Sequence, residues 1–115
     1  MKFKAYNKEN NSFYSWIEIV KSSEISKDSI INWLFRNDNV IPLLYTGIND
    51  INGKEIYDSD IIEVDNNKFI VKLSLPSFIL EPIGGVGHKL LSDYVDSDIE
   101  KIGNKYNGRD LLWAQ

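Results

Sequence analysis

Three carboxylates close together in the sequence are the first residues that could do chemistry. Glu55, Asp58 and Asp60 offer the hard oxygen ligands that Mg²⁺ and Ca²⁺ prefer, and a metal bound there could serve a hydrolase. The segment lacks the alternating acidic spacing and the central glycine of a calcium loop. A structural role is the better interpretation, because a carboxylate directly before a strand, as Asp60 precedes Ile61, can accept hydrogen bonds from turn amides.

The histidine and the glycine-rich segment give weaker signals for catalysis. His88 is the single histidine, and nothing near it in the sequence resembles a nucleophile elbow or an oriented acid. The run Gly-Gly-Val-Gly at residues 84–87 lacks the Gly-Lys-Ser/Thr of a phosphate-binding loop. Both features are typical of a loop. We therefore predict no catalytic residue, no metal ligand and no cofactor.

Aromatic residues near the N-terminus could form a binding surface. A polar run separates residues 3–6 from residues 13–20, and both segments are rich in aromatic and β-branched residues, which predicts a hairpin. In its second strand Tyr14 and Trp16 fall on the face opposite to Phe13. A body that covers one face cannot bury both, so we expect self-association, most simply as a symmetric dimer, with Tyr14 and Trp16 as interaction residues.

The elements that must position these residues are mostly strands. The clearest pattern joins residues 61–65 and 68–73 across Asn66-Asn67, in a register that pairs Val64 with Phe69 and Ile62 with Val71. One helix of about ten residues is predicted to start at Ser26 and to end near residues 37–39. Further elements predicted from the sequence are strands at 43–46, 78–80 and 99–106, a turn at Asn52-Gly53, and a short turn or helix at 107–113 in which Trp113 packs on the body.

The predicted fold is a mainly β single domain spanning residues 1–115. We expect a small barrel-like or folded antiparallel or mixed sheet with an N-terminal hairpin and one short helix. A chain of 115 residues with 43% hydrophobic residues can bury one core. It has no Cys and no apolar run long enough to cross a membrane, so we expect a cytoplasmic protein.

The net charge of −4 argues against nucleic acid as the main partner, because phosphate backbones select a concentrated basic surface. Two acidic segments sharpen this argument. They comprise Glu55, Asp58, Asp60, Glu63 and Asp65 in one, and Asp93, Asp96, Asp98 and Glu100 in the other.

One long block resembles a known family. Residues 45–62, which read YTGINDINGKEIYDSDII, resemble the signature block of the YopX family of phage and prophage proteins. Residues 2–10 and 102–106 extend the resemblance, and it is weakest over residues 23–40 and 76–97. Ser59 stands where the family commonly has glycine, which weakens the prediction of a positive φ there. The block is read as a structural signature comprising Tyr45, Gly47, Asn52, Gly53, Tyr57 and Asp60.

The resemblance implies a compact, mainly β, barrel-like domain encoded by phages and prophages, with no catalytic residues to carry over. The leading hypothesis is a non-enzymatic accessory protein that binds itself or another phage or host protein. A nucleic-acid-associated protein of phage replication or regulation is the first alternative, since small β barrels often stack single strands on aromatic residues. A metal-dependent hydrolase that uses Glu55, Asp58 and Asp60 is the second.

Overall fold

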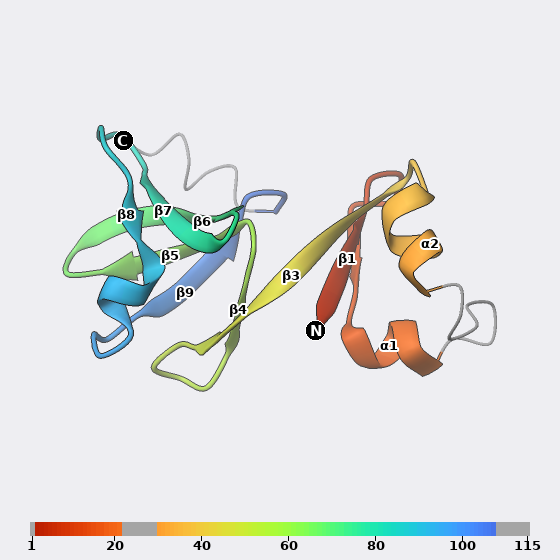
Figure 1. Ribbon diagram of the computed structural model, residues 1–115, viewed down its shortest axis with the longest axis horizontal. Helices are drawn as coiled ribbons and strands as arrows, with labels where there is room; N and C mark the ends of the chain where they lie inside the picture. The colour runs from red at the N-terminus through yellow and green to blue at the C-terminus, as the bar shows by residue number, and fades with distance from the viewer. Residues whose placement is uncertain (1, 22–29, 108–115) are drawn as a thin grey trace. The chain divides into compact units, whose positions relative to one another are not determined.

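The computed structural model describes residues 2–21 and 30–107 and shows a mostly β chain (Figure 1). The chain divides into two compact units, Met1–Leu44 and Tyr45–Gln115, and the division falls inside one long strand, β3 (Val40–Asn49). The predicted mainly β class is confirmed. All strand pairs in the described residues are antiparallel, so the mixed-sheet alternative does not apply to them.

The first unit is a small sheet covered by two short helices. Strand β1 (Phe3–Asn7) lies between β2 (Ser12–Tyr14) and the first half of β3. Helices α1 (Trp16–Lys21) and α2 (Ile30–Arg36) lie next to this sheet (Figure 1). Its core is built from both helices and the strands and comprises Phe3, Ala5, Ile19, Leu34 and Val40, with Tyr14, Trp16, Ile30, Trp33 and Leu44 packed against it.

The predicted hairpin is confirmed only as far as Tyr14, and the predicted strand over residues 13–20 is wrong beyond that residue. The chain turns into α1 because Ser15 and Glu18 form a capping box. The Glu18 N–H donates to Ser15 Oγ at 3.2 Å, and the Ser15 N–H donates to Glu18 Oε1 at 3.2 Å. This reciprocal pair satisfies two backbone donors at the helix start, and the described residues therefore contain two short helices where one was predicted.

Helix α2 agrees with the sequence at its C-terminal end. It ends at Arg36, directly before the predicted turn residues, and the Asn39 N–H donates to Asn37 Oδ1 at 3.0 Å. That bond offers the backbone an alternative to the helical pattern. The predicted start at Ser26 lies outside the described residues, as does the prediction for Trp113.

The second unit contains a five-stranded antiparallel half-barrel in the order β8-β7-β6-β5-β9. The strands are β5 (Asp60–Val64), β6 (Asn67–Ser74), β7 (Ser77–Pro82), β8 (Lys89–Leu90) and β9 (Glu100–Asn104). A short strand, β4 (Glu55–Tyr57), pairs with the second half of β3, and a 3₁₀ turn, η2 (Leu91–Tyr94), follows β8. One core fills this unit and comprises Ile56, Ile62, Val64, Phe69, Val71, Leu80, Leu91 and Ile99.

The hairpin of β5 and β6 is confirmed, but its predicted register is wrong by two residues. Ile62 pairs with Phe69 and Val64 pairs with Asn67, so the turn is Asp65-Asn66. Both turn residues have positive φ, 53° and 65°, as a type I′ turn requires. Because side chains alternate with a period of two, this shift leaves the predicted buried face unchanged.

The other predicted strands are found with different bounds: residues 43–46 lie within the longer β3, residues 78–80 lie within the longer β7, and the predicted strand 99–106 contains the shorter β9. No helix of the described residues is both long and apolar enough to cross a membrane.

Candidate functional site

The bend between β4 and β5 contains Ser59, whose backbone forms hydrogen bonds to β6 and to the residue after β9. Ser59 has a φ of 75°, so the left-handed bend forms although the residue is not glycine. The Ser59 N–H donates to the Val71 carbonyl at 2.7 Å, and the Ser59 carbonyl accepts from the Lys105 N–H at 2.8 Å. The backbone of one residue therefore ties β6 to the end of β9.

The Asp60 carboxylate is fully buried beneath this bend. Its Oδ2 accepts from the Tyr57 N–H at 2.6 Å, and its Oδ1 accepts from Asn104 Nδ2 at 3.0 Å. Lys101 Nζ lies 3.0 Å from Oδ2, which makes a buried ion pair. The predicted cap at Asp60 is confirmed, and it reaches further than a local turn because Asn104 and Lys101 come from β9.

A second buried carboxylate, Asp50, holds the loop that precedes β4. Its Oδ1 accepts from the N–H groups of Asn52 and Lys54, at 2.9 and 2.8 Å, and its Oδ2 accepts from the Lys101 N–H at 3.0 Å. Burial by itself raises the pKa of Asp50, but these three N–H groups outweigh it and the pKa is lowered overall. Asp50 thus stays ionised while it fixes the loop to β9.

Lys101 connects the two buried carboxylates. The backbone N–H of Lys101 donates to Asp50. Its ammonium group forms the ion pair with Asp60 and also donates to the Glu55 carbonyl at 3.2 Å. The ammonium also lies 5.9 Å from the centre of the Tyr57 ring. Burial, followed by the charge of Glu55 and the hydrogen bond to it, raises the pKa of Tyr57.

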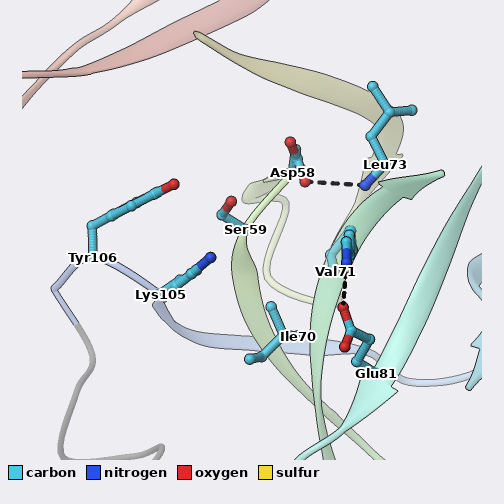
Figure 2. Close-up of a pocket in the computed structure, with 9 residues that line it drawn as sticks. Asp58, Ser59, Ile70, Val71, Leu73, Glu81, Lys105 and Tyr106 are labelled. Atoms are coloured by element: carbon cyan, nitrogen blue, oxygen red, sulfur yellow. Dashed lines mark hydrogen bonds and ion pairs between the residues drawn. The ribbon is translucent and has the colours of Figure 1, made fainter. Parts of the chain in front are cut away.

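Beside the bend lies a pocket of about 460 Å³ (Figure 2). Its lining is mostly polar, and the residues that line it are Asp58, Ser59, Ile70, Val71, Lys72, Leu73, Glu81, Lys105 and Tyr106. Lys72 and Glu81 pair with each other across exposed strand positions at 3.4 Å. Asp58 and Lys105 are therefore the charged groups left to meet a ligand in this pocket.

Asp58 is half-buried at the edge of this pocket, and one of its oxygens accepts from the Leu73 N–H at 3.1 Å (Figure 2). Burial raises the pKa of Asp58 above its usual range, against the lowering effect of the Leu73 and Ser59 N–H groups and of the Lys105 charge. The carboxylate is thus less well stabilised than that of Asp50.

The three carboxylates proposed as metal ligands do not gather. In residues 2–21 and 30–107 no group of three or more His, Asp or Glu side chains is arranged to hold a metal ion. Asp58 faces β6, Asp60 faces β9, and Glu55 accepts from the Tyr57 hydroxyl at 3.2 Å. His88 is exposed in the loop after the glycine-rich run and does not line the pocket.

The remaining signature residues shape the β3 to β4 connection. Tyr45 pairs with Tyr57 across the two strands, and their ring centres lie 5.4 Å apart. Gly47 and Gly53 have positive φ, 87° and 81°, so the bulge and the turn both use a conformation that glycine adopts without strain. Asn52 lies in that turn and is exposed.

The predicted interaction residues Tyr14 and Trp16 face their own unit. Tyr14 packs edge-on against Trp33, with ring centres 5.3 Å apart, and Trp16 lies 6.4 Å from Phe3. Both are partly buried. Most of their ring surface therefore contacts this chain.

The sequence prediction omitted Asp50 and Lys101 from the site. Asp50 has a local signal, because an Asp two residues before Asn52-Gly53 is typical of an Asx-turn. Lys101 has none, since its partner Asp60 lies far away along the chain. Taken together, the described residues of the site provide acceptors for backbone donors and one ion pair, between Asp60 and Lys101.

Comparison with known proteins gives one family. No curated protein matches the chain, whereas the family model described as YopX protein matches residues 2–112. The match includes the loop, the bend and β9, and so every residue of the site described above. The chain belongs to the YopX family.

Proposed function

We propose that this protein is a non-enzymatic phage or prophage accessory protein that acts by binding protein, either another copy of itself or a phage or host protein. Membership of the YopX family suggests a phage-type protein. The observation that carries the proposal is the exposure of large apolar side chains on both helices of the first unit. Ile17 and Ile31 are each 61% exposed, and Phe35 is 56% exposed. Exposed apolar surface of this kind is typical of protein contacts.

The bend supports a non-enzymatic role, because its hydrogen-bond acceptors receive donors from this chain itself. Asp60 and Asp50 bind backbone and side-chain donors, and Ser59 is held through its backbone. A nucleophile would need a base within hydrogen-bond reach. Loss of these contacts would instead separate β4, β6 and β9, which is a structural consequence.

Retention of proteins from phage-infected host lysate tests the binding role. The full chain is immobilised, and the retained proteins are identified by mass. The matched variant is Ile31→Glu, which places a charge on the exposed side of α2. We expect the variant to lose a protein that the unchanged chain retains. Retention of no protein by a chain that is also monomeric would contradict the proposal. Retention of the same proteins by both chains would show that Ile31 is not part of the binding surface.

Calorimetric titration with Mg²⁺ and Mn²⁺ tests the non-enzymatic part. We expect no binding heat, because the three carboxylates of the bend region point to different partners. A saturable heat that disappears in Asp58→Asn would favour the hydrolase alternative instead.

A further inference from the structure

The pocket beside the bend holds two opposite charges that do not pair with each other. Asp58 accepts from the Leu73 N–H at 3.1 Å, and no side chain in the part of the chain that the structure describes donates to it. Lys105 is fixed through its backbone, because its N–H donates to the Ser59 carbonyl at 2.8 Å. Among the described residues its ammonium belongs to no ion pair. The pocket therefore contains one acceptor and one donor that the fold does not join.

These groups lie on the side of β6 that faces away from the core. Ile70 lines the pocket, whereas the side chain of the next residue, Val71, belongs to the core cluster. Figure 2 draws the side chains of Lys105 and Tyr106 with their tips toward the bend. The pocket volume of about 460 Å³ equals the share of about 15 water molecules at roughly 30 Å³ each. This volume falls in the range of small-molecule sites.

The charges of the lining balance. Besides Asp58 and Lys105 the pocket is lined by Lys72 and Glu81, which pair with each other at 3.4 Å. A small anion in the pocket would lie near the Asp58 carboxylate, and a small cation would lie near the Lys105 ammonium. Each would be repelled by a charge of its own sign. The balance favours an uncharged ligand.

An uncharged ligand that uses both groups must donate to a carboxylate and accept from an ammonium. A hydroxyl does both through a single oxygen. Sugars carry several hydroxyls on one ring, and the C–H groups of the ring form an apolar face. The Ile70 side chain and the Tyr106 ring line the same pocket and offer apolar surface to such a face. The lining thus matches both sides of a sugar ring.

We infer that this pocket binds a carbohydrate, with one sugar hydroxyl donating to Asp58 and accepting from Lys105. The inference goes beyond the proposed protein-binding function, because all the lining residues belong to the second unit and the exposed apolar helices belong to the first. Burial raises the pKa of Asp58, so the chain by itself stabilises the ionised carboxylate poorly. A donated hydroxyl would stabilise it. A half-buried carboxylate of this kind in a pocket is typical of a functional position.

Two-dimensional amide NMR of the full chain tests the inference. The sugar probes are D-glucose, D-galactose, D-mannose, N-acetyl-D-glucosamine and D-ribose, each raised to about 50 mM because a single ring has few atoms and binds in the millimolar range. At least one sugar should shift the N–H signals of Ser59, Leu73 and Lys105 saturably. Inorganic phosphate, glycine and N-methylacetamide represent an anion, a zwitterion and a peptide group. They should produce no saturable shift.

Two variants test the assigned roles. Asp58→Asn replaces the charged acceptor by a neutral one, and Lys105→Met removes the donor while the backbone N–H that binds Ser59 remains. Each should weaken sugar binding at least about 5-fold, because a hydrogen bond to a charged group is roughly twice as strong as a neutral one. The matched control is Lys89→Met, which removes an exposed lysine outside the pocket lining and should leave sugar binding unchanged. Far-UV circular dichroism checks that each variant folds.

The carbohydrate assignment is overturned if no sugar gives saturable shifts, if the shifts lie outside the pocket, or if phosphate, glycine or N-methylacetamide binds there instead. Unchanged sugar affinity in folded Asp58→Asn or Lys105→Met would refute the shared hydroxyl, as would an equal loss in Lys89→Met. None of these results depends on Ile31 or on proteins retained from lysate. The protein-binding function is therefore tested separately.

Discussion

The Asp60 carboxylate is fully buried and receives the Tyr57 N–H at 2.6 Å, Asn104 Nδ2 at 3.0 Å and Lys101 Nζ at 3.0 Å. Alanine in its place leaves two neutral donors buried without this acceptor, at about 1 to 3 kcal/mol each. The Lys101 side chain is 21% exposed, so its ammonium can turn partly to water and adds less. We therefore expect Asp60→Ala to lower the free energy of unfolding by about 3 to 5 kcal/mol, the usual range for removal of one partner of a buried ion pair.

Urea unfolding followed by far-UV circular dichroism measures this loss. Fluorescence is less suitable, because two of the three Trp residues, Trp16 and Trp33, belong to the first unit and would add its signal to that of the second. The melting temperature should fall by more than about 10 °C for a domain of this size. The matched control is Asp96→Ala, at an exposed acidic position, which should change stability by less than about 0.5 kcal/mol.

An intermediate variant separates geometry from charge. Asp60→Asn keeps an oxygen that can accept from the Tyr57 N–H but loses the charge that pairs with Lys101. The loss in free energy of unfolding for Asp60→Asn should lie between the losses for the control Asp96→Ala and for Asp60→Ala. A loss below about 1 kcal/mol for Asp60→Ala would show that the carboxylate does not hold β9 to the bend.

Four further changes test other parts of the second unit. Phe69→Ala should cost about 3 to 5 kcal/mol in urea unfolding because Phe69 is buried in the core; a loss below about 1 kcal/mol would contradict the assigned face. Ser59→Gly should raise stability by about 0.5 to 1 kcal/mol, since glycine relieves the left-handed φ at some cost in chain entropy, and a clear loss would contradict this. Asp50 has a lowered pKa, so its stabilisation is present above its unfolded value of about 3.9 and is lost as pH falls through the folded pKa; Asp50→Asn should therefore flatten the stability curve below about pH 4. Asp58 has a raised pKa, so its ionisation lowers stability as pH rises above about 4, and Asp58→Asn should equal or exceed the unchanged chain in stability at pH 7.

The second unit was largely predictable because its signals are local. Alternation of apolar residues identified the hairpin of β5 and β6 and its buried face. The register was missed because Asn66-Asn67 and Asp65-Asn66 both suit a tight turn, and alternation alone does not distinguish a shift by two residues. Only the pairing with neighbouring strands decides between them.

The first unit was predicted less well, because a local cap outweighed strand propensity. Residues 16–20 are rich in β-branched residues, yet the pattern Ser-x-x-Glu from Ser15 to Glu18 starts a helix. Reading that capping box would have corrected the strand. The role of Lys101 could not be read locally, since its partners Asp50 and Asp60 become neighbours only when the sheet forms.

The division between the two units falls inside β3, between Leu44 and Tyr45. Residues before it pair with β1, and residues after it pair with β4. Because the two pairings meet inside one strand, the two units share the continuous backbone of β3 and no loop separates them. The two halves are therefore not interchangeable modules: a recombination event that exchanged one of them would have to supply a continuous ten-residue strand whose two ends suit different neighbours.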